Sequence, residues 1–196
     1  MSVLELWCWR HPRAQGAAGR CIGITDLPVD PRKARRLAHR IRATVRRHGL
    51  PRRVWVSPLA RSRGVGAWLA RWGFECRVDA RLAELDFGRW DGRPWTAVPW
   101  AEVQAWEADL RHHAPGGGEC LAQLEARVQA YVREREAAGD KAVLLVGHGG
   151  WITALGQSPL GVGAPQGPID AARWPPPPRH GALVRWRPAP AAVHPR

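Results

Sequence analysis

Residues 4–12 read Leu4-Glu5-Leu6-Trp7-Cys8-Trp9-Arg10-His11-Pro12 and join a short apolar run to an abrupt polar end. A run of this length that stops at a chain-breaking proline predicts a buried β-strand. In open α/β sheets, ligands bind at the carboxyl ends of parallel strands. We therefore expect this strand to deliver the guanidinium of Arg10 and the imidazole of His11 to a crevice. An Arg-His pair is also common at solvated strand ends, so the rest of the chain must decide.

Two further apolar runs end in the same kind of group. Residues 53–56 lead into Ser57-Pro58-Leu59-Ala60-Arg61, and residues 142–146 lead into Gly147-His148-Gly149-Gly150. The run at 142–146 is the most apolar in the chain and predicts a central parallel strand. Because the carboxyl ends of parallel strands share one edge of a sheet, we expect Arg61 and His148 to meet the Arg-His pair there.

Helical patterns alternate with these strands. A helix over residues 31–48 is predicted, with Asp30 as its N-cap and Gly49 as its C-terminal cap. Further helices are predicted at 62–72, 100–112 and 119–137, and further strands at 74–78 and 182–186. The alternation indicates an α/β fold, a three-layer α/β/α sandwich with a mostly parallel central sheet. We expect one domain over residues 1–187, a long irregular loop at 157–178 and a disordered tail at 188–196.

The formal net charge of +13 comes almost entirely from arginine, because Lys33 and Lys141 are the only lysines. An anionic partner, either nucleic acid or a phosphorylated substrate, is one explanation. Biased coding is the other, since Arg, Ala, Gly, Pro and Trp are all abundant. The arginines are spread along the chain, which favours bias. We therefore predict no specific nucleic-acid partner.

No stretch of the sequence is long and apolar enough to span a membrane, and the first residues lack the features of a signal peptide. The cysteines are scattered, with no CxxC pair, which predicts reduced thiols. We therefore expect a cytoplasmic protein without a membrane partner. The oligomeric state is not encoded in any pattern that we recognise.

Two arginines and two histidines at one sheet edge suit a phosphate monoester. Arginine binds the non-bridging oxygens in bidentate fashion, and histidine can accept the phosphoryl group covalently. A proton donor for the leaving oxygen is also needed, and Glu84, in an irregular segment beside apolar neighbours, is the candidate. Gly23, in the glycine-rich loop that follows Pro12, and Gly149 are candidates for backbone contacts to the anion. A plain surface loop is the alternative for Gly23.

A metal site is the rival use of His11 and His148. The sequence contains no HxxxH, HxH or Cys/His pair at ligand spacing, and the neighbouring arginines would repel a cation. We therefore predict no metal. His112 and His113 are expected to face solvent, and no role is assigned to the remaining histidines, which are His39, His48, His180 and His194.

Five ordered motifs resemble those of the histidine phosphatase superfamily, also called the phosphoglycerate-mutase-like family. They are Arg10-His11, Ser57-Pro58-Leu59-Ala60-Arg61, residues 82–92, Pro115-Gly116-Gly117-Gly118-Glu119 and Gly147-His148-Gly149-Gly150. The resemblance implies that His11 is the phosphorylated nucleophile and that Glu84 donates the proton. It further implies that Arg10, Arg61 and His148 hold the phosphoryl group and that no metal or organic cofactor takes part. In size and in the stretch 25–28, the chain looks most similar to the α-ribazole phosphatases of cobalamin biosynthesis.

The chain also departs from the family pattern. Pro12 stands where the family has glycine, and Val65 stands where threonine is common. These changes leave the five key side chains in place and bear on the substrate and the rate.

The leading hypothesis is a phosphomonoesterase (a hydrolase) for a small phosphorylated metabolite, with α-ribazole 5′-phosphate as the first candidate. A phosphoglycerate-mutase-type phosphotransferase and a non-catalytic arginine-rich binding protein on a phosphatase scaffold are the alternatives. The tryptophans of residues 90–106 have two possible uses, of which core packing is favoured over stacking on an aromatic base. They are Trp90, Trp95, Trp100 and Trp106.

Overall fold

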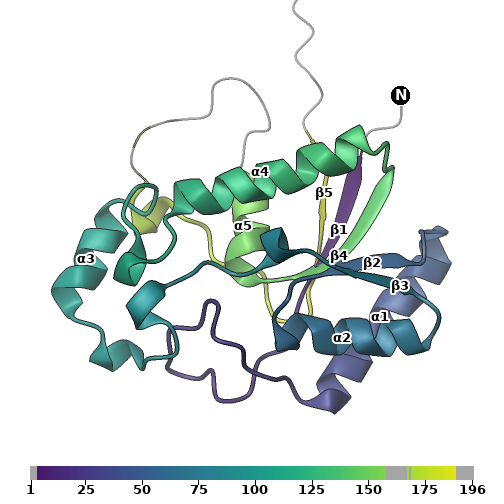
Figure 1. The fold of residues 1–196 in the computed structure, drawn as a ribbon, viewed down its shortest axis with the longest axis horizontal. Helices are drawn as coiled ribbons and strands as arrows, with labels where there is room; N and C mark the ends of the chain where they lie inside the picture. Colours follow the sequence, from purple (N-terminus) through teal and green to yellow (C-terminus); the bar gives the residue numbers. More distant parts are fainter. Residues whose placement is uncertain (1–3, 158–166, 168, 189–196) are drawn as a thin grey trace, which may run out of the picture.

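The computed structural model describes residues 4–157, 167 and 169–188, and a five-stranded sheet forms its centre (Figure 1). The strands are β1 (Glu5–Arg10), β2 (Arg53–Val56), β3 (Glu75–Val78), β4 (Ala142–Gly147) and β5 (Leu183–Trp186), in the order β3-β2-β4-β1-β5. The first four strands are parallel, and β5 pairs antiparallel with β1. The predicted α/β class with a mostly parallel sheet is confirmed.

Helices cover both faces of the sheet. Helices α1 (Pro31–His48) and α2 (Ala60–Arg71) lie on one face, and α4 (Leu121–Ala137) and α5 (Gly149–Gln157) lie on the other (Figure 1). Side chains of β1 alternate between the two cores: Trp7 and Trp9 pack with α1 and α2, whereas Leu6 and Cys8 pack with α4 and α5. This alternation is the period of two that a strand buried on both faces requires.

The sequence signals at the ends of α1 act as predicted. The Asp30 side chain accepts a hydrogen bond from the Arg32 N–H at 2.7 Å, and Gly49 closes the helix in the left-handed conformation with φ of 60°. The buried residues of α1 recur at helical spacing, and they are Ala34, Leu37, Ala38, Ile41 and Val45. The helix therefore packs by one apolar stripe and turns its arginines outward.

The segment between β3 and α4 is more irregular than the sequence indicated. Helix α3 (Trp100–Ala108) ends four residues before the predicted position, because Asp109 has φ of −147° and its carboxylate accepts from the His112 N–H instead. The rest of the segment consists of 3₁₀ turns: η1 (Ala80–Leu82), η2 (Gly88–Trp90), η3 (Trp95–Ala97) and η4 (Pro115–Gly117). Helix α3 and the turns of residues 88–117 lie to one side of the sheet, on the left in Figure 1.

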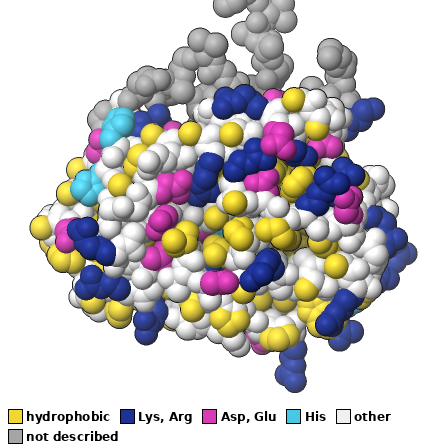
Figure 2. Space-filling model, in the orientation of Figure 1, with side chains coloured by type: hydrophobic (Ala, Val, Ile, Leu, Met, Phe, Trp, Pro, Cys, Tyr) yellow, Lys and Arg dark blue, Asp and Glu magenta, His cyan; other side chains and the backbone are white. Residues whose placement is uncertain are grey.

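Two predictions fall partly outside the described residues. Of the predicted loop 157–178, the structure describes Gln157, which ends α5, residue 167, and residues 169–178, which contain η5 (Ala171–Arg173). Of the predicted tail it describes only Pro188. On the face drawn in Figure 2, Lys and Arg side chains are spread around the molecule, with acidic side chains among them. Among the helices that the structure describes, none has the length and apolar character needed to cross a membrane.

Candidate active site

The register of the sheet brings the predicted polar groups together. Arg10 in β1 pairs with Gly147 in β4, so His11 and His148 leave two adjacent parallel strands at the same level. The two imidazole centroids lie 4.9 Å apart. In β2, Val56 pairs with Val146, so the motif that carries Arg61 begins at this level too.

His11 is buried, and its hydrogen bonding fixes one tautomer. Its Nδ1 lies 2.6 Å from the Pro12 carbonyl oxygen, and because a carbonyl only accepts, Nδ1 carries the proton. No described residue hydrogen-bonds Nε2. Burial first, and then the positive charge of Arg61, lower the pKa of His11 to about 3. At neutral pH the imidazole is therefore uncharged, with a lone pair on Nε2.

Arg61 is only 1 % exposed and joins several parts of the site. Its Nε donates to Nδ1 of His148 at 3.2 Å, and its two terminal nitrogens donate to the carbonyl oxygens of Thr25, at 2.8 Å, and Gly23. Because Nδ1 of His148 accepts, Nε2 carries the proton and donates to the Ser57 hydroxyl at 2.6 Å. Burial, followed by the charges of His11 and Arg61, keeps the pKa of His148 well below its ordinary value.

The start of β5 adds another histidine beside Arg10. The Arg10 N–H donates to Ala182 at 3.1 Å, and a guanidinium nitrogen of Arg10 donates to Pro178 at 2.7 Å. His180 donates from Nδ1 to the His11 carbonyl oxygen at 3.1 Å, and its ring lies 5.3 Å from the His11 ring. Burial and the Arg10 charge lower the pKa of His180.

Glu84 is buried at the amino end of α5. Its Oε1 accepts from the N–H groups of Leu85 and Trp151, both at 3.2 Å, and its Oε2 accepts from Gly150 at 3.1 Å. A carboxylate oxygen has two lone pairs, so among the described residues only Oε2 keeps an unused one. The free N–H groups of a helix terminus thus hold the carboxylate in place.

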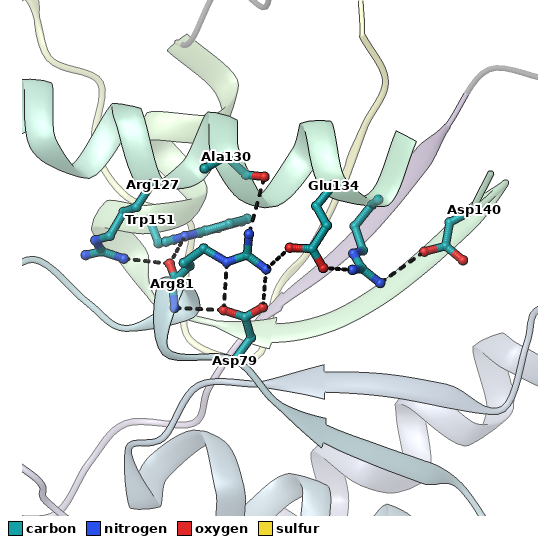
Figure 3. Close-up of polar contacts among 8 residues, drawn as sticks. Asp79, Arg81, Arg127, Ala130, Glu134, Asp140 and Trp151 are labelled. Carbon is teal, nitrogen blue, oxygen red and sulfur yellow. Dashed lines mark hydrogen bonds and ion pairs between the residues drawn. The ribbon is translucent and has the colours of Figure 1, made fainter. Parts of the chain in front are cut away.

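A polar network fixes the segment that carries Glu84 (Figure 3). The Arg81 guanidinium pairs with Asp79 at 2.6 Å and with Glu134 of α4 at 2.7 Å. The Arg81 carbonyl accepts from Arg127 of α4 at 2.7 Å and from the Trp151 indole of α5 at 2.8 Å. Arg127 also donates to the carbonyl oxygens of Ala83 and Glu84 itself. The position of Glu84 is therefore set by α4 and α5 together.

A cavity of about 610 Å³ opens at this sheet edge. Five of the predicted site residues line it, namely Arg10, His11, Arg61, Glu84 and Gly149, and so does His180. His148 lies behind the cavity wall, fully buried. Gly149 leaves room for Arg10, since a Cβ there would lie 3.0 Å from the guanidinium carbon.

Gly23 does not line the cavity. Its N–H donates to the Asp91 carboxylate at 3.2 Å, and a Cβ at this position would overlap the Leu85 carbonyl oxygen. The glycine therefore serves a close backbone approach between the first loop and the Glu84 segment. In the described ranges, no group of three or more His, Cys, Asp or Glu side chains is arranged to hold a metal ion.

The sequence analysis missed His180 and the role of Ser57. A signal for His180 exists, because it lies just before the predicted strand 182–186. Only an antiparallel orientation brings the start of that strand to the carboxyl ends of the others, and the sequence did not reveal its orientation. Ser57 begins a recognised motif, but its bond to His148 depends on the register of β2 against β4.

A family model described as "Histidine phosphatase superfamily (branch 1)" matches residues 6–170. The chain therefore belongs to the histidine phosphatase superfamily. Glucosyl-3-phosphoglycerate phosphatase of Mycobacterium tuberculosis is 32 % identical over 123 residues, which cover 54 % of this chain and 49 % of that protein. The match thus spans about half the length of this relative.

Solved structures share the fold over nearly the whole chain. The mycobacterial glucosyl-3-phosphoglycerate phosphatase in complex with VO3 superposes with a TM-score of 0.72 at 28 % identity, covering 93 % of this chain and 92 % of that one. A putative alpha-ribazole-5′-P phosphatase from Escherichia coli K-12 gives a TM-score of 0.72 at 21 % identity, covering 93 % and 89 %. At that identity the second likeness shows the fold alone.

Proposed function

We propose that this protein is a phosphomonoesterase that works through a phosphohistidine on His11. The observation that supports this most directly is the state of the His11 ring. It is uncharged, its Nε2 has no hydrogen-bond partner among the described residues, and it lines a cavity together with Arg10 and Arg61. A neutral imidazole is a nucleophile, and the two guanidinium groups attract a phosphate dianion to it.

In the first step, Nε2 of His11 attacks phosphorus while Arg10 and Arg61 hold the non-bridging oxygens. The bond from phosphorus to the ester oxygen breaks, and Glu84 gives its proton to the leaving alkoxide. The phosphorylated ring keeps its Nδ1 proton on the Pro12 carbonyl. In the second step, the Glu84 carboxylate takes a proton from water, which attacks phosphorus, and the Nε2–P bond breaks to return the electron pair to His11.

The two other histidines support this centre in different ways. Both ring nitrogens of His148 are hydrogen-bonded within the protein, one to Ser57 and the other to Arg61, so this histidine orients Arg61. It can contact a phosphoryl group only if one of these two hydrogen bonds is broken. His180 lines the cavity and uses Nδ1 on the His11 backbone, so its Nε2 is the atom that it offers to a phosphate oxygen. We assign phosphate binding to Arg10, Arg61 and His180, with His148 behind them.

The substrate is a small phosphorylated metabolite, and two candidates are supported. α-Ribazole 5′-phosphate follows from the resemblance of the sequence, and the superposition with the Escherichia coli protein agrees at the level of fold. Glucosyl-3-phosphoglycerate follows from the name of the mycobacterial relatives. A cytoplasmic location is supported by the cysteines, all of which are free thiols.

The test is phosphate release from p-nitrophenyl phosphate and from both candidate substrates, in EDTA, by the wild-type protein and by His11→Ala. We expect release that EDTA does not affect and that His11→Ala lowers at least a thousandfold. Acid-labile, base-stable ³²P on the wild-type chain, absent from His11→Ala, would identify the intermediate. Turnover retained by His11→Ala would refute the mechanism.

The same assays separate the alternatives. A mutase would isomerise 3-phosphoglycerate faster than it releases phosphate. A non-catalytic binding protein would release none, and its affinity for random DNA would fall steeply with salt.

A further inference from the structure

Beyond His11 and Glu84, the cavity continues into a compartment that we name the aromatic chamber. It is lined by the aromatic side chains of Phe87, Trp95, Trp106 and Trp174 and by the buried Leu110 and Leu121. The volume of the whole cavity, about 610 Å³, is in the range of small-molecule sites and well above the needs of a phosphoryl group. The chamber is therefore the space available to the rest of the substrate.

Three of the four rings of the chamber are held by contacts with other rings. Phe87 meets Trp95 and Trp106 edge to face, with centroids 6.1 and 5.7 Å apart. Trp106 rests in turn on the fully buried Trp90, whose indole N–H donates to Glu102 at 2.9 Å. Edge-to-face contacts of this kind favour one arrangement of the rings. The chamber is thus formed before any ligand arrives, which lowers the entropic cost of binding.

Backbone contacts close the chamber on the side of Trp174. The Leu110 N–H donates to the Ile169 carbonyl at 2.7 Å, and this bond brings residues 169–174 alongside the end of α3. The same segment continues through Pro177 and Pro178 to His180. One stretch of chain therefore lines both the chamber and the reaction centre.

The chamber lies on the leaving-group side of the reaction centre. In the proposed mechanism Glu84 protonates the ester oxygen, so the group that departs lies next to Glu84. The chain runs from Glu84 through Leu85 to Phe87, and all three residues line the cavity. Trp95, 39 % exposed, stands at the rim as a large apolar surface facing open space. Aromatic side chains are common in the lining of small-molecule sites.

The charges of the cavity are unevenly divided. The positive charge of Arg13 lowers the pKa values of Arg10 and His180, so Arg13 lies at the end of the cavity that contains His11. In the chamber the charged groups are Glu107, which follows Trp106, and Arg20, which donates to the Gly92 carbonyl at 2.8 Å. These two opposite charges offset each other, so a carboxylate on the leaving group gains no net attraction in the chamber.

We propose that the aromatic chamber selects phosphate esters whose leaving group carries an uncharged aromatic ring, in preference to esters of sugar acids. This inference rests on the proposed phosphatase function and specifies its substrate class. The ring packs against Trp95 and Trp106 while the phosphoryl group reaches His11. A benzimidazole ribonucleoside meets this description, and a glycoside of glyceric acid does not.

The first test measures binding without chemistry. The probes are 2-naphthylmethylphosphonate and methylphosphonate, which present the same charged group with and without a ring and cannot be hydrolysed. By calorimetry we expect the wild-type protein to bind the aromatic probe at least tenfold more tightly. Trp95→Ala should lose most of this preference and Trp95→Phe should keep it. The control Trp100→Ala removes an indole that is 66 % exposed and lies outside the cavity, and it should behave as wild type.

The second test compares kcat/KM for 2-naphthylmethyl phosphate and for 3-phosphoglycerate. Both release an alkoxide, so the ratio reports on the chamber. We expect a ratio of at least ten in wild type and a three- to tenfold smaller ratio in Trp95→Ala. The control Trp100→Ala should keep the wild-type ratio and the wild-type turnover of 3-phosphoglycerate. Equal binding of the two probes, or a ratio that Trp95→Ala leaves unchanged, would overturn the chamber proposal. His11-dependent turnover of p-nitrophenyl phosphate would then still support the phosphatase, so the two failures are distinguishable.

Discussion

The two ends of the cavity are built in different ways. At the end of the cavity that contains His11, which we call the reaction end, Arg61, Glu84 and His148 are each fixed by two or more hydrogen bonds. Their partners lie in the loop before α1, directly after the strands β2 and β4, or at the start of α5. In the aromatic chamber, Phe87 and Trp106 are positioned mainly by contacts between rings. A hydrogen bond is lost when either its donor or its acceptor is replaced, whereas a ring contact is largely kept when the ring is replaced by an apolar group of similar volume. We therefore expect substitutions at the reaction end to cause large losses of activity or stability. Substitutions in the chamber should cause smaller changes, mainly in the preference among substrates.

The largest loss of activity is expected from Glu84→Gln, and it should differ between two kinds of ester. The carbonyl oxygen of glutamine can accept from one of the two α5 N–H groups, but its NH2 group cannot accept from the other and has no acidic proton to give to a leaving alkoxide. For an alkyl ester such as 2-naphthylmethyl phosphate, we expect kcat to fall about a hundredfold to ten-thousandfold. For p-nitrophenyl phosphate, whose leaving group needs little protonation, the loss should be only a few fold. Steady-state kinetics with the two esters measure the difference, and equal losses would contradict the role of Glu84.

A second sharp failure is expected from Arg61→Lys. Lysine keeps the positive charge but cannot reproduce the planar fork that serves Gly23, Thr25 and His148 at once. Leaving buried acceptors without partners should lower the free energy of unfolding by about 2–3 kcal/mol. Denaturation in urea measures this loss, and kcat/KM for p-nitrophenyl phosphate should fall at least tenfold. The matched surface change Arg63→Lys, at an exposed ion pair with Asp26, should leave both quantities near wild type.

Stability should depend on pH through the buried histidines of the reaction end. The folded state holds the pKa of His11 near 3 and that of His148 well below 6.5, so the unfolded chain binds more protons at intermediate pH. The contribution of these uncharged histidines to the free energy of unfolding is therefore complete above about pH 6.5 and declines as the pH falls toward 3. Between pH 7 and pH 5 we expect His11→Gln to lose about 2 kcal/mol less unfolding free energy than wild type. Urea titrations at both pH values test this, and parallel losses would contradict it.

The reaction end was predictable because its geometry follows from topology. Once the runs at 4–9, 53–56 and 142–146 are assigned as parallel strands, the side chains that follow them must share an edge. Their pairing in β1, β2 and β4 confirms this logic. Helix α1 was predictable for a similar reason, because both of its caps are encoded locally by Asp30 and Gly49.

The chamber was not predictable in this way. Its rings come from the residue before η2, from η3, from α3 and from the segment after Ile169, and no periodic pattern relates them. The glycine run after Pro115 illustrates the problem. A Cβ at Gly116 or Gly118 would overlap the backbone of residues 86–90, so these glycines serve an approach between two irregular segments that sequence spacing does not reveal. Trp90 and Trp106 therefore look alike in the sequence, although one is core and the other lines the chamber.

The smallest effect is expected at Pro12, which tests whether the reaction end needs the family's glycine. Pro12 contributes its carbonyl oxygen to Nδ1 of His11, and a glycine at this position has the same carbonyl. Glycine adds an N–H and loosens the unfolded chain, so Pro12→Gly should lower the unfolding free energy by about 0.5–1 kcal/mol. Turnover of p-nitrophenyl phosphate should stay within about threefold of wild type, because the His11 tautomer is kept. A rise of tenfold or more would mean that the missing N–H limits catalysis. The backbone at position 12 would then belong to the groups of the reaction end on which turnover depends.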